Sequence, residues 1–273
     1  MLIDTHCHLD ASEFNEDRTQ VIARAQSAGV RAVVIPSVER ANFDTVRSLA
    51  HSFSGGFYAL GIHPIFVPQA DESDLLVLDA QIKASLGDPR FVAIGEIGLD
   101  FFIPALAEPA MRARQEMYYT AQLDLALHYD LPVLLHVRRS QDVLLKHLRH
   151  RSHIGGLAHA FNGSFQQAAQ FIDQGFALGL GGAMTFERSL QIRRLATRLP
   201  LEALVLETDA PDIPPAWLGT KQTPSRRNEP AQVAGIADVL SELRALPRVQ
   251  LDDALATNAR RVLPRLAAGL TAT

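Results

Sequence analysis

Eight short apolar runs recur along the whole sequence, and their number and spacing constrain the fold more than any other feature. Each run is rich in branched or aromatic residues with little polar alternation, which is typical of strands buried on both faces. The runs span residues 2–6, 31–36, 57–63, 91–97, 131–137, 154–161, 176–182 and 203–208. Amphipathic segments with helical spacing separate or follow them, including 111–128, 141–149, 165–174, 189–199 and 231–243.

Strands that alternate with helices predict a parallel β/α fold, and eight is the strand count of a closed barrel. We therefore expect an α/β fold of the TIM (β/α)8 barrel type, formed by residues 1–273 as a single domain. Gly29 and Gly175 stand where helix C-caps are expected, just before the next run. A doubly wound open sheet is the alternative, but no GxGxxG follows the first run, as its dinucleotide-binding form would require. The Pro-rich segment 211–230 follows the last run and is expected to cover the catalytic face.

The composition is that of an ordinary globular protein. Charged residues make up 21% of the chain and the formal net charge is −4, so no global charge advertises a nucleic-acid binder, although a local basic pocket is compatible with it. The single cysteine, Cys7, excludes an internal disulfide and fits a reducing cytosol. No apolar run approaches the roughly 18 residues of a membrane span. We expect a cytoplasmic protein with no membrane partner, and a monomer is compatible with the sequence.

Polar residues that suit metal binding lie at the ends of several runs. His6 and His8 are two residues apart, so on an extended strand both point to one side and Cys7 points to the other. A histidine pair alone is as typical of a structural role as of a metal site. Its weight rises because a barrel brings all strand ends to one face. The residues at or near the other ends are His63, Glu96, His136, His159 and Asp209.

This set of donors predicts a site for divalent cations. Imidazoles and carboxylates suit Zn, Mn, Co or Ni, and Mg less well. Glu96 is placed to bridge two ions through its two oxygens, and bound ions would supply hydroxide near neutral pH. We expect Asp209 to accept the proton of the attacking water. The alternative for Asp209 is a helix cap before Ala210 and Pro211.

Several motifs together resemble the TatD family of metal-dependent hydrolases, in the amidohydrolase superfamily and closest to its YjjV-like branch. They are DTHCH (4–8), GEIGLD (95–100), LPVLLHVR (131–138), AHAFNGS (158–164), ETDAP (207–211) and RNEP (227–230). The resemblance implies a TIM barrel with one to three ions of Zn, Mg, Mn or Ni, and we expect two. It implies that His6, His8 and Asp209 bind one metal. It implies that His136 and His159 bind the second, with Glu96 shared as a catalytic bridge.

The resemblance also implies a nuclease and points to one departure from the family. Members are associated with magnesium-dependent DNA degradation as 3′→5′ exonucleases that prefer single strands. The carboxylated lysine of other superfamily members has no counterpart at a predicted strand end. After His136 this chain reads Val-Arg-Arg-Ser, where the family more often has an acidic residue near the arginine. That difference concerns substrate contacts and leaves the metal ligands in place.

Substrate contacts are expected from residues around the same face. His63 is expected to touch substrate or shuttle a proton rather than bind metal. Arg138 lies two residues after His136 and is expected to hold a phosphate, with a salt bridge at the barrel rim as the alternative. Arg227 is expected to reach a phosphate from the last loop, and Arg226 is as typical of solvated surface charge. Aromatic residues in these loops suit either base stacking or packing: Phe66, Phe101, Phe102 and Phe161.

Three functions compete for this sequence. The first is a divalent-metal-dependent phosphodiesterase or deoxyribonuclease acting on DNA or a small phosphodiester with metal-activated hydroxide. The second keeps the metal site but hydrolyses an ester, lactone or amide, which the net charge of −4 favours mildly. The third is a non-catalytic metal-binding barrel, against which the complete set of six ligands counts.

Overall fold

The computed structural model describes residues 1–151, 153–219 and 227–271. Its strands are β1 (Leu2–Asp4), β2 (Val30–Pro36), β3 (Gly56–Leu60), β4 (Phe91–Asp100), β5 (Val133–Arg138), β6 (Gly156–Ala158), β7 (Phe176–Leu180) and β8 (Leu204–Leu206). Its α-helices are α1 (Arg18–Ser27), α2 (Phe43–His51), α3 (Ser73–Ser85), α4 (Pro109–Tyr129), α5 (Gln141–Leu148), α6 (Phe165–Asp173), α7 (Leu190–Arg198), α8 (Val233–Arg244), α9 (Arg248–Val262) and α10 (Pro264–Thr271). Among these described residues, no helix combines the length and apolarity that crossing a bilayer requires.

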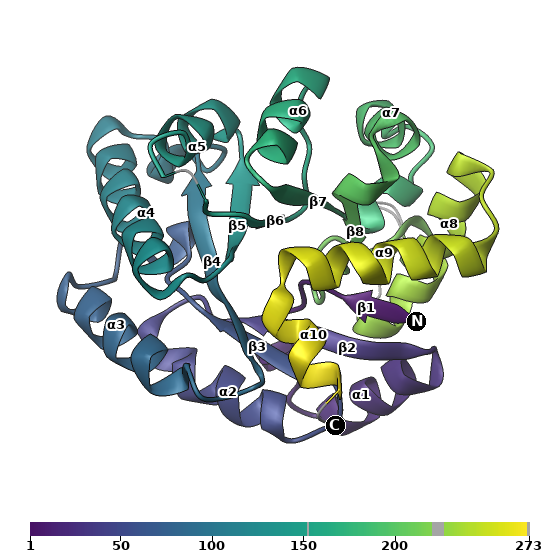
Figure 1. The fold of residues 1–273 in the computed structure, drawn as a ribbon, viewed down its shortest axis with the longest axis horizontal. Helices are drawn as coiled ribbons and strands as arrows, with labels where there is room; N and C mark the ends of the chain where they lie inside the picture. Colours follow the sequence, from purple (N-terminus) through teal and green to yellow (C-terminus); the bar gives the residue numbers. More distant parts are fainter. Residues whose placement is uncertain (152, 220–226, 272–273) are drawn as a thin grey trace.

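The strands form one parallel sheet in the order β1 to β8, and helices surround it on the outside (Figure 1). Backbone hydrogen bonds also join the two ends of this order. Thr5 N donates to Leu206 O at 3.1 Å, and Asp209 N donates to His6 O at 2.9 Å. These contacts bring the first and last strands together, so the predicted TIM barrel is confirmed and the open sheet is excluded.

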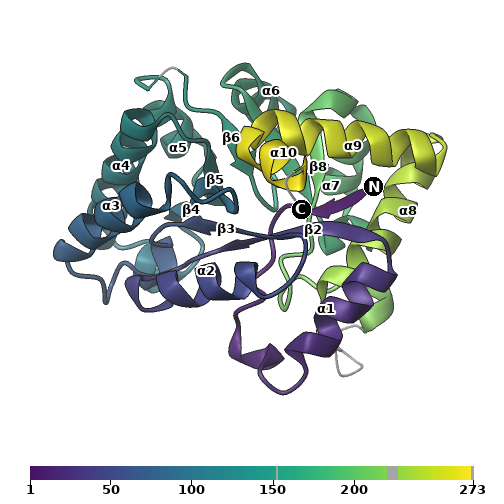
Figure 2. The same cartoon turned by 60° about the horizontal axis from the view of Figure 1, so that its bottom comes forward.

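The barrel has two apolar layers because strand residues alternate in direction. One set of strand residues packs outward against the surrounding helices, as Tyr58 and Leu135 do. The alternate set packs in the barrel interior, as Phe57 and Leu134 do. At the N-terminal ends of the strands this interior layer is closed by α9 and α10, which lie across it in Figure 2. Leu266 of α10 is fully buried there.

A bulge in β4 directs the central carboxylate of the site. β4 pairs with β5 as Ile94 with Val133 and then as Ile97 with Leu135, so β4 carries one extra residue in between. A bulge of this kind re-aims a side chain. Glu96 lies within it, and its backbone N–H donates to Ser37 O at 2.9 Å. Its side chain therefore points into the barrel, where it is 1% exposed.

All eight predicted strands are confirmed, though most are shorter than the apolar runs. The run at 154–161, for example, forms a strand only at Gly156–Ala158, because its last residues turn into the site. The predicted helices are confirmed to within a few residues. Gly29 and Gly175 follow helix ends with φ of 87° and 86°, the left-handed conformation that glycine tolerates best. Of the segment 211–230, residues 220–226 lie outside the described part, and Pro211, Asp212 and Ile213 line the cavity at the catalytic face.

Candidate metal centre and active site

A cavity of about 1190 Å³ opens at the C-terminal ends of the strands. Loops that follow the strands form its wall, as in other barrels of this type. Most of the predicted site residues line this cavity, and His6 lies fully buried beneath it. The lining members are His8, His63, Glu96, His136, Arg138, His159 and Asp209.

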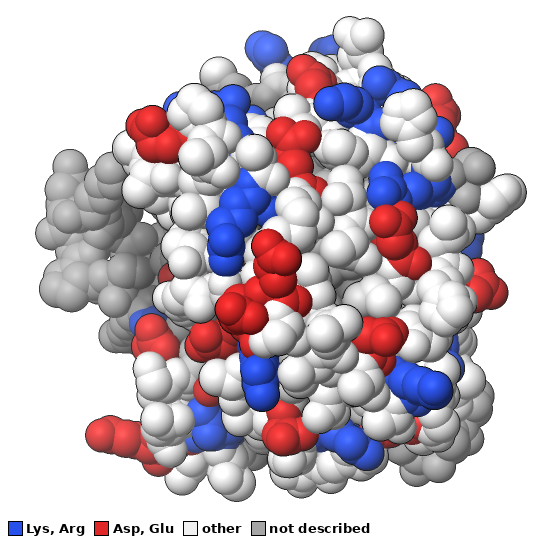
Figure 3. Space-filling view, turned by 90° about the vertical axis from the view of Figure 1, so that its left-hand side faces the viewer, with Lys and Arg blue, Asp and Glu red and all other residues white. Residues whose placement is uncertain are grey.

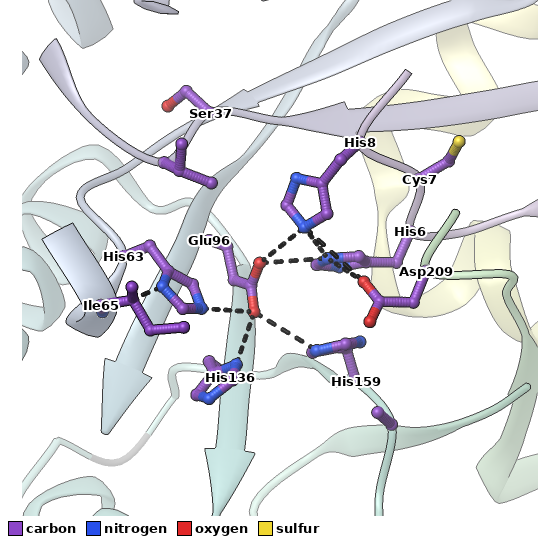
Figure 4. A network of polar contacts seen from close by, with 12 residues as sticks. His6, Cys7, His8, Ser37, His63, Ile65, Glu96, His136, His159 and Asp209 are labelled. Atoms are coloured by element: carbon purple, nitrogen blue, oxygen red, sulfur yellow. Dashed lines mark hydrogen bonds and ion pairs between the residues drawn. The ribbon is translucent and has the colours of Figure 1, made fainter. Parts of the chain in front are cut away.

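A first group of donors surrounds one oxygen of Glu96 (Figure 4). Glu96 Oε2 lies 3.1 Å from His6 Nε2 and 3.3 Å from His8 Nε2. Asp209 Oδ1 lies 3.5 Å from the first of these nitrogens and 3.6 Å from the second. The side chain of Cys7 points away from this group and is fully buried, as the strand alternation predicts.

A second group of donors surrounds the other oxygen of Glu96. Glu96 Oε1 lies 3.3 Å from His63 Nε2, 3.0 Å from His136 Nδ1 and 3.3 Å from His159 Nε2. These histidines follow β3, lie in β5 and follow β6, so three separate strands deliver them. The two oxygens of one carboxylate thus face two different sets of imidazoles, which is the arrangement a bridging ligand needs.

Asp209 is held in a strained backbone conformation at the edge of the first group. Its φ is 55°, in the left-handed region that costs energy for residues other than glycine. Burial raises the pKa of this carboxyl to about 6, against the opposing effects of His159 and His8. Its side chain is 13% exposed, so it also meets the cavity. A carboxylate with this position and pKa is suited to accept a proton near neutral pH.

The donor atoms are arranged to bind divalent cations, because hydrogen bonds among them do not satisfy every buried polar atom. Glu96 Oε2 is buried and, among the described residues, has no hydrogen-bond partner despite the nearby imidazoles. Burial lowers the pKa of His6 to about 3. Burial also opposes protonation of His159, but Asp209 and other carboxylates outweigh it and raise its pKa to about 10. Neighbouring imidazoles thus favour opposite protonation states beside the same carboxylates. A divalent cation would neutralise the carboxylates and leave all the imidazoles neutral.

Three donor sets have ligand atoms within 4.8 Å of one another, which is compatible with shared ions. They are His6 with His8 and Asp209, His6 with Glu96 and His159, and His63 with Glu96 and His136. Glu96 belongs to two of them. His136 and His159, which the resemblance assigns to one ion, belong to different sets, and both sets contain Glu96.

His63 differs from the other imidazoles in the group it presents to the cavity. The backbone N–H of Ile65 donates to His63 Nδ1 at 3.1 Å. A ring nitrogen that accepts a hydrogen bond carries no proton, so a neutral ring is protonated at Nε2. Burial lowers the pKa of His63 to about 4, which keeps the ring neutral. It therefore offers an N–H donor at Nε2, which favours the prediction of a substrate contact over that of a metal ligand.

Two carboxylates that the sequence analysis did not single out support the histidines from behind. Asp100 Oδ2 lies 3.1 Å from His136 Nε2, and Glu207 Oε1 lies 3.3 Å from His159 Nδ1. Partners of this kind fix the tautomer and orientation of an imidazole so that its other nitrogen faces the site. Both carboxylates stand inside the quoted motifs GEIGLD and ETDAP. Their position at strand ends was the signal that could have identified them.

The predicted arginines have different surroundings. Arg138 lines the cavity and is 48% exposed; its Nη1 lies 3.8 Å from Asp100 Oδ2. Arg227 is instead engaged by Asp17, whose two carboxylate oxygens each accept from it at 2.8 Å. Its guanidinium also lies over the ring of Phe14, and it does not line the cavity. The structure thus places Arg227 against α1 rather than in the site, and Arg226 lies outside the described residues.

The predicted aromatic contacts divide in the same way. Phe66, Phe102 and Phe161 line the cavity. Phe101 is 8% exposed and packs in the core, with Arg112 4.3 Å from its ring centre. Phe161 is only 1% exposed and also packs in the core, so Phe66 and Phe102 are the two placed to meet a molecule in the cavity.

Comparison with known proteins identifies the chain. The model of the family described as TatD related DNase matches residues 3–264, nearly the whole sequence. The chain belongs to the TatD family. This confirms the resemblance that the motifs indicate.

Two relatives place this TatD-family chain more closely. It is 40% identical over 257 residues to the uncharacterized metal-dependent hydrolase YjjV of Escherichia coli, covering 94% of this chain and 95% of that protein. It is 32% identical over 269 residues to the 3′-5′ ssDNA/RNA exonuclease TatD of Cronobacter turicensis, covering 96% and 97% of the two chains. The crystal structure of the Escherichia coli YjjV protein superimposes with a TM-score of 0.87 at 36% identity, covering 96% and 98%.

These comparisons settle the class of the protein. It is a metal-dependent hydrolase of the TatD family with a TIM barrel, as the sequence predicts. The roles of the individual residues remain predictions, which the geometry above allows us to state in detail.

Proposed function

We propose that this TatD-family chain is a phosphodiesterase that removes nucleotides from the 3′ end of single-stranded DNA. The observation that carries the proposal is the carboxylate of Glu96, whose two oxygens face two separate groups of imidazoles. Phosphodiester hydrolysis is a reaction for which paired metal sites are widely used. The name of the Cronobacter relative, a single-strand exonuclease, supports the substrate.

The metal-binding residues follow from the two groups. His6, His8 and Asp209 would hold one ion, and His136 and His159 would hold the other, with Glu96 shared between them. When bound, such ions lower the pKa of water and stabilise charge on the attacking and leaving oxygens. Mixed imidazole and carboxylate donors suit Zn, Mn or Ni, and Mg is the fourth candidate.

The remaining residues orient the substrate and move protons. Asp209 accepts the proton of the attacking water at its carboxylate, which meets the cavity beside the first group of donors. His63 donates its Nε2 hydrogen to a non-bridging phosphate oxygen. Arg138 holds a phosphate at the cavity mouth, where nearly half of its side chain is exposed. Arg227 is omitted because Asp17 engages its guanidinium.

Three broader features complete the proposal. Residues 1–273 act as one domain, in which strands from the whole chain supply the site. A cytoplasmic location remains the prediction made from the single cysteine. A monomer is sufficient, because the donors for both ions come from one chain.

The test is hydrolysis of a 3′-labelled single-stranded oligonucleotide by metal-loaded protein. We expect the substitution Glu96→Gln to lower kcat/KM at least about 10³-fold, because both groups of donors lose their shared charge. The matched control is Glu72→Gln, which removes an exposed carboxylate at the start of α3. Intact oligonucleotide after incubation with Mg, Mn, Zn and Ni, or equal rates for Glu96→Gln and the parent, would reject the proposal.

The charge of the cavity wall favours a second candidate, hydrolysis of a carboxylic ester, lactone or amide. The described residues that line the cavity include Asp10, Glu13, Glu39 and Asp212, against two cations, Arg138 and Arg139. An uncharged substrate would avoid repulsion by these acids. A panel of esters, lactones and amides assayed beside the oligonucleotide separates the two functions by which substrate shows the higher kcat/KM.

A further inference from the structure

Two arginines and one aromatic ring meet at one edge of the cavity. The ring of Phe102 lies 4.0 Å from Cζ of Arg138 and 4.7 Å from Cζ of Arg139. Phe102 follows β4 and is 45% exposed, and the arginines stand at the end of the neighbouring strand β5. All three residues line the cavity. We call Phe102, Arg138 and Arg139 the arginine–phenylalanine shelf.

The backbone turns sharply at Arg139 and ties the shelf to the neighbouring strand. Arg139 has a φ of 57°, in the left-handed region, where a residue other than glycine is under strain. The turn is tied to β4 because Ser140 Oγ donates to Leu99 O at 2.6 Å and accepts from Arg138 N at 3.2 Å. A strained arginine that is fixed to the neighbouring strand and aimed at an exposed ring indicates a binding role.

The opposite wall of the cavity carries the opposite charge. Glu39 follows β2, Asp10 and Glu13 follow β1, and Asp212 follows β8. In a ring of eight strands these positions lie across from β4 and β5. Arg138 and Arg139 are the only arginines or lysines among the described residues that line the cavity. The part of the cavity wall formed by the described residues is therefore polarised, whereas acidic and basic side chains intermingle on the outer face that Figure 3 shows.

We propose that the arginine–phenylalanine shelf binds the nucleotide next to the scissile phosphate and so sets the path of the single strand. This inference rests on the proposed function. A strand that ran toward the acidic wall would bring phosphates against carboxylates, so the strand leaves the metal centre over β4 and β5. There a base stacks on the exposed ring and guanidinium planes, and the next phosphate accepts hydrogen bonds from the guanidinium groups.

The shelf also explains how a pocket with many acids can act on a polyanion. The terminal nucleotide alone faces the acidic wall, where its sugar and base carry donors rather than charge. Only the shelf meets the continuing backbone. A substrate without a second phosphate, such as bis(p-nitrophenyl) phosphate, therefore gains nothing from the phosphate contact of Arg139.

The test compares a single-stranded hexanucleotide with bis(p-nitrophenyl) phosphate for the parent and the variants Phe102→Ala and Arg139→Ala. We expect the ratio of the two kcat/KM values to fall about 10- to 100-fold in Arg139→Ala, mainly through KM of the hexanucleotide, and Phe102→Ala to raise KM of the hexanucleotide. Arg139→Gly is a second variant that suits the positive φ and guards against a folding defect. The two Arg139 variants should also show a shallower dependence of oligonucleotide KM on salt.

Arg112→Ala is the matched control. It removes an arginine that lies 4.3 Å from the neighbouring ring of Phe101, and neither residue lines the cavity. The control should leave the substrate ratio unchanged. An unchanged ratio in both Arg139 variants, or an unchanged KM of the hexanucleotide in Phe102→Ala, would overturn the shelf while the proposed function stands. A parent protein that cleaves neither phosphodiester would instead remove the proposed function, and the shelf with it.

Discussion

The two ends of the barrel interior use the same strands for opposite purposes. On β5, Leu134 and His136 are two residues apart and point to the same side. Leu134 is fully buried in the apolar interior that α9 and α10 close. His136 lies one step closer to the cavity and contacts Glu96 at 3.0 Å. Successive residues on the same face of β5 therefore serve different roles, Leu134 in apolar packing and His136 in the polar site.

This contrast separates the part of the barrel that stabilises the fold from the part that carries the candidate active site. At the N-terminal ends of the strands the interior consists of apolar side chains in contact, and burial of such surface favours folding. Arg265 also ties α10 to the barrel by donating to Phe91 O at 2.6 Å and to Leu86 O at 2.8 Å. At the C-terminal ends of the strands the interior contains carboxylates and imidazoles. Their desolvation opposes folding unless they are paired or bind metal. Substitutions at the two ends should therefore separate stability from activity.

The largest effect on stability should come from the apolar end. We expect Leu266→Ala to lower the free energy of unfolding by about 2–5 kcal/mol, because it leaves a cavity under the barrel. Urea denaturation of the metal-loaded protein measures this. Leu76→Ala, on the outer surface of α3 where Leu76 is 73% exposed, is the control and should change stability little. A large loss of kcat/KM in Leu266→Ala, measured where the variant is fully folded, would show that the two ends are not independent.

At the polar end, Glu207→Gln should weaken metal binding without a large loss of stability. The variant keeps the oxygen that accepts from Ala160 N at 2.5 Å but loses the charge beside His159 Nδ1. We expect about a 10- to 100-fold lower metal affinity, as for other carboxylates behind a metal-bound imidazole. Competition with a chromophoric chelator measures it. Glu202→Gln, an exposed neighbour before β8, is the control, and equal affinities for the two variants would contradict the role of Glu207.

The last effect is a dependence of stability on pH and concerns Asp4, which lies between the two ends at the seam of β1 and β8. Its carboxylate is fully buried and accepts from Thr208 N at 2.9 Å and Thr208 Oγ1 at 2.6 Å. Burial raises the pKa of Asp4 to about 8, against these hydrogen bonds. An aspartate in the unfolded chain has a pKa near 3.9, so between about pH 4 and 8 only the folded chain holds this proton.

The sign of the resulting pH dependence follows directly. The stabilising contribution of the protonated Asp4 is complete below about pH 4 and is lost as pH rises toward 8, by at most about 1.4 kcal/mol per pH unit. We expect Asp4→Asn to remove this slope, so that the variant gains stability relative to the parent from pH 5 to 8. Urea titrations at several pH values, with the exposed Asp253→Asn as control, measure the difference. Parallel curves for Asp4→Asn and the parent would show that Asp4 is ionised in the folded chain.

Much of the fold and of the site could be predicted from the sequence because both depend on local periodicity. Strands buried on both faces are apolar throughout, so eight runs revealed eight strands. The donors stood out because each interrupts such a run at its end, as His136 does after Leu135. Asp100 and Glu207 were overlooked because a position at a strand end does not distinguish a carboxylate behind a histidine from one that faces the cavity. Arg227 was expected in the site because its partner Asp17 is 210 residues away along the chain.

The barrel of eight strands, and the residues at the catalytic ends of those strands, could be predicted from the sequence alone. That information is local, since the period of a strand fixes the side of each residue and the barrel brings the strand ends together. The folded chain fixes which oxygen of Glu96 meets which histidines, which nitrogen of His63 carries its proton, and which wall of the cavity is basic. These properties arise from contacts between side chains of different strands. The distances and directions of those contacts cannot be derived from the spacing of residues along the chain.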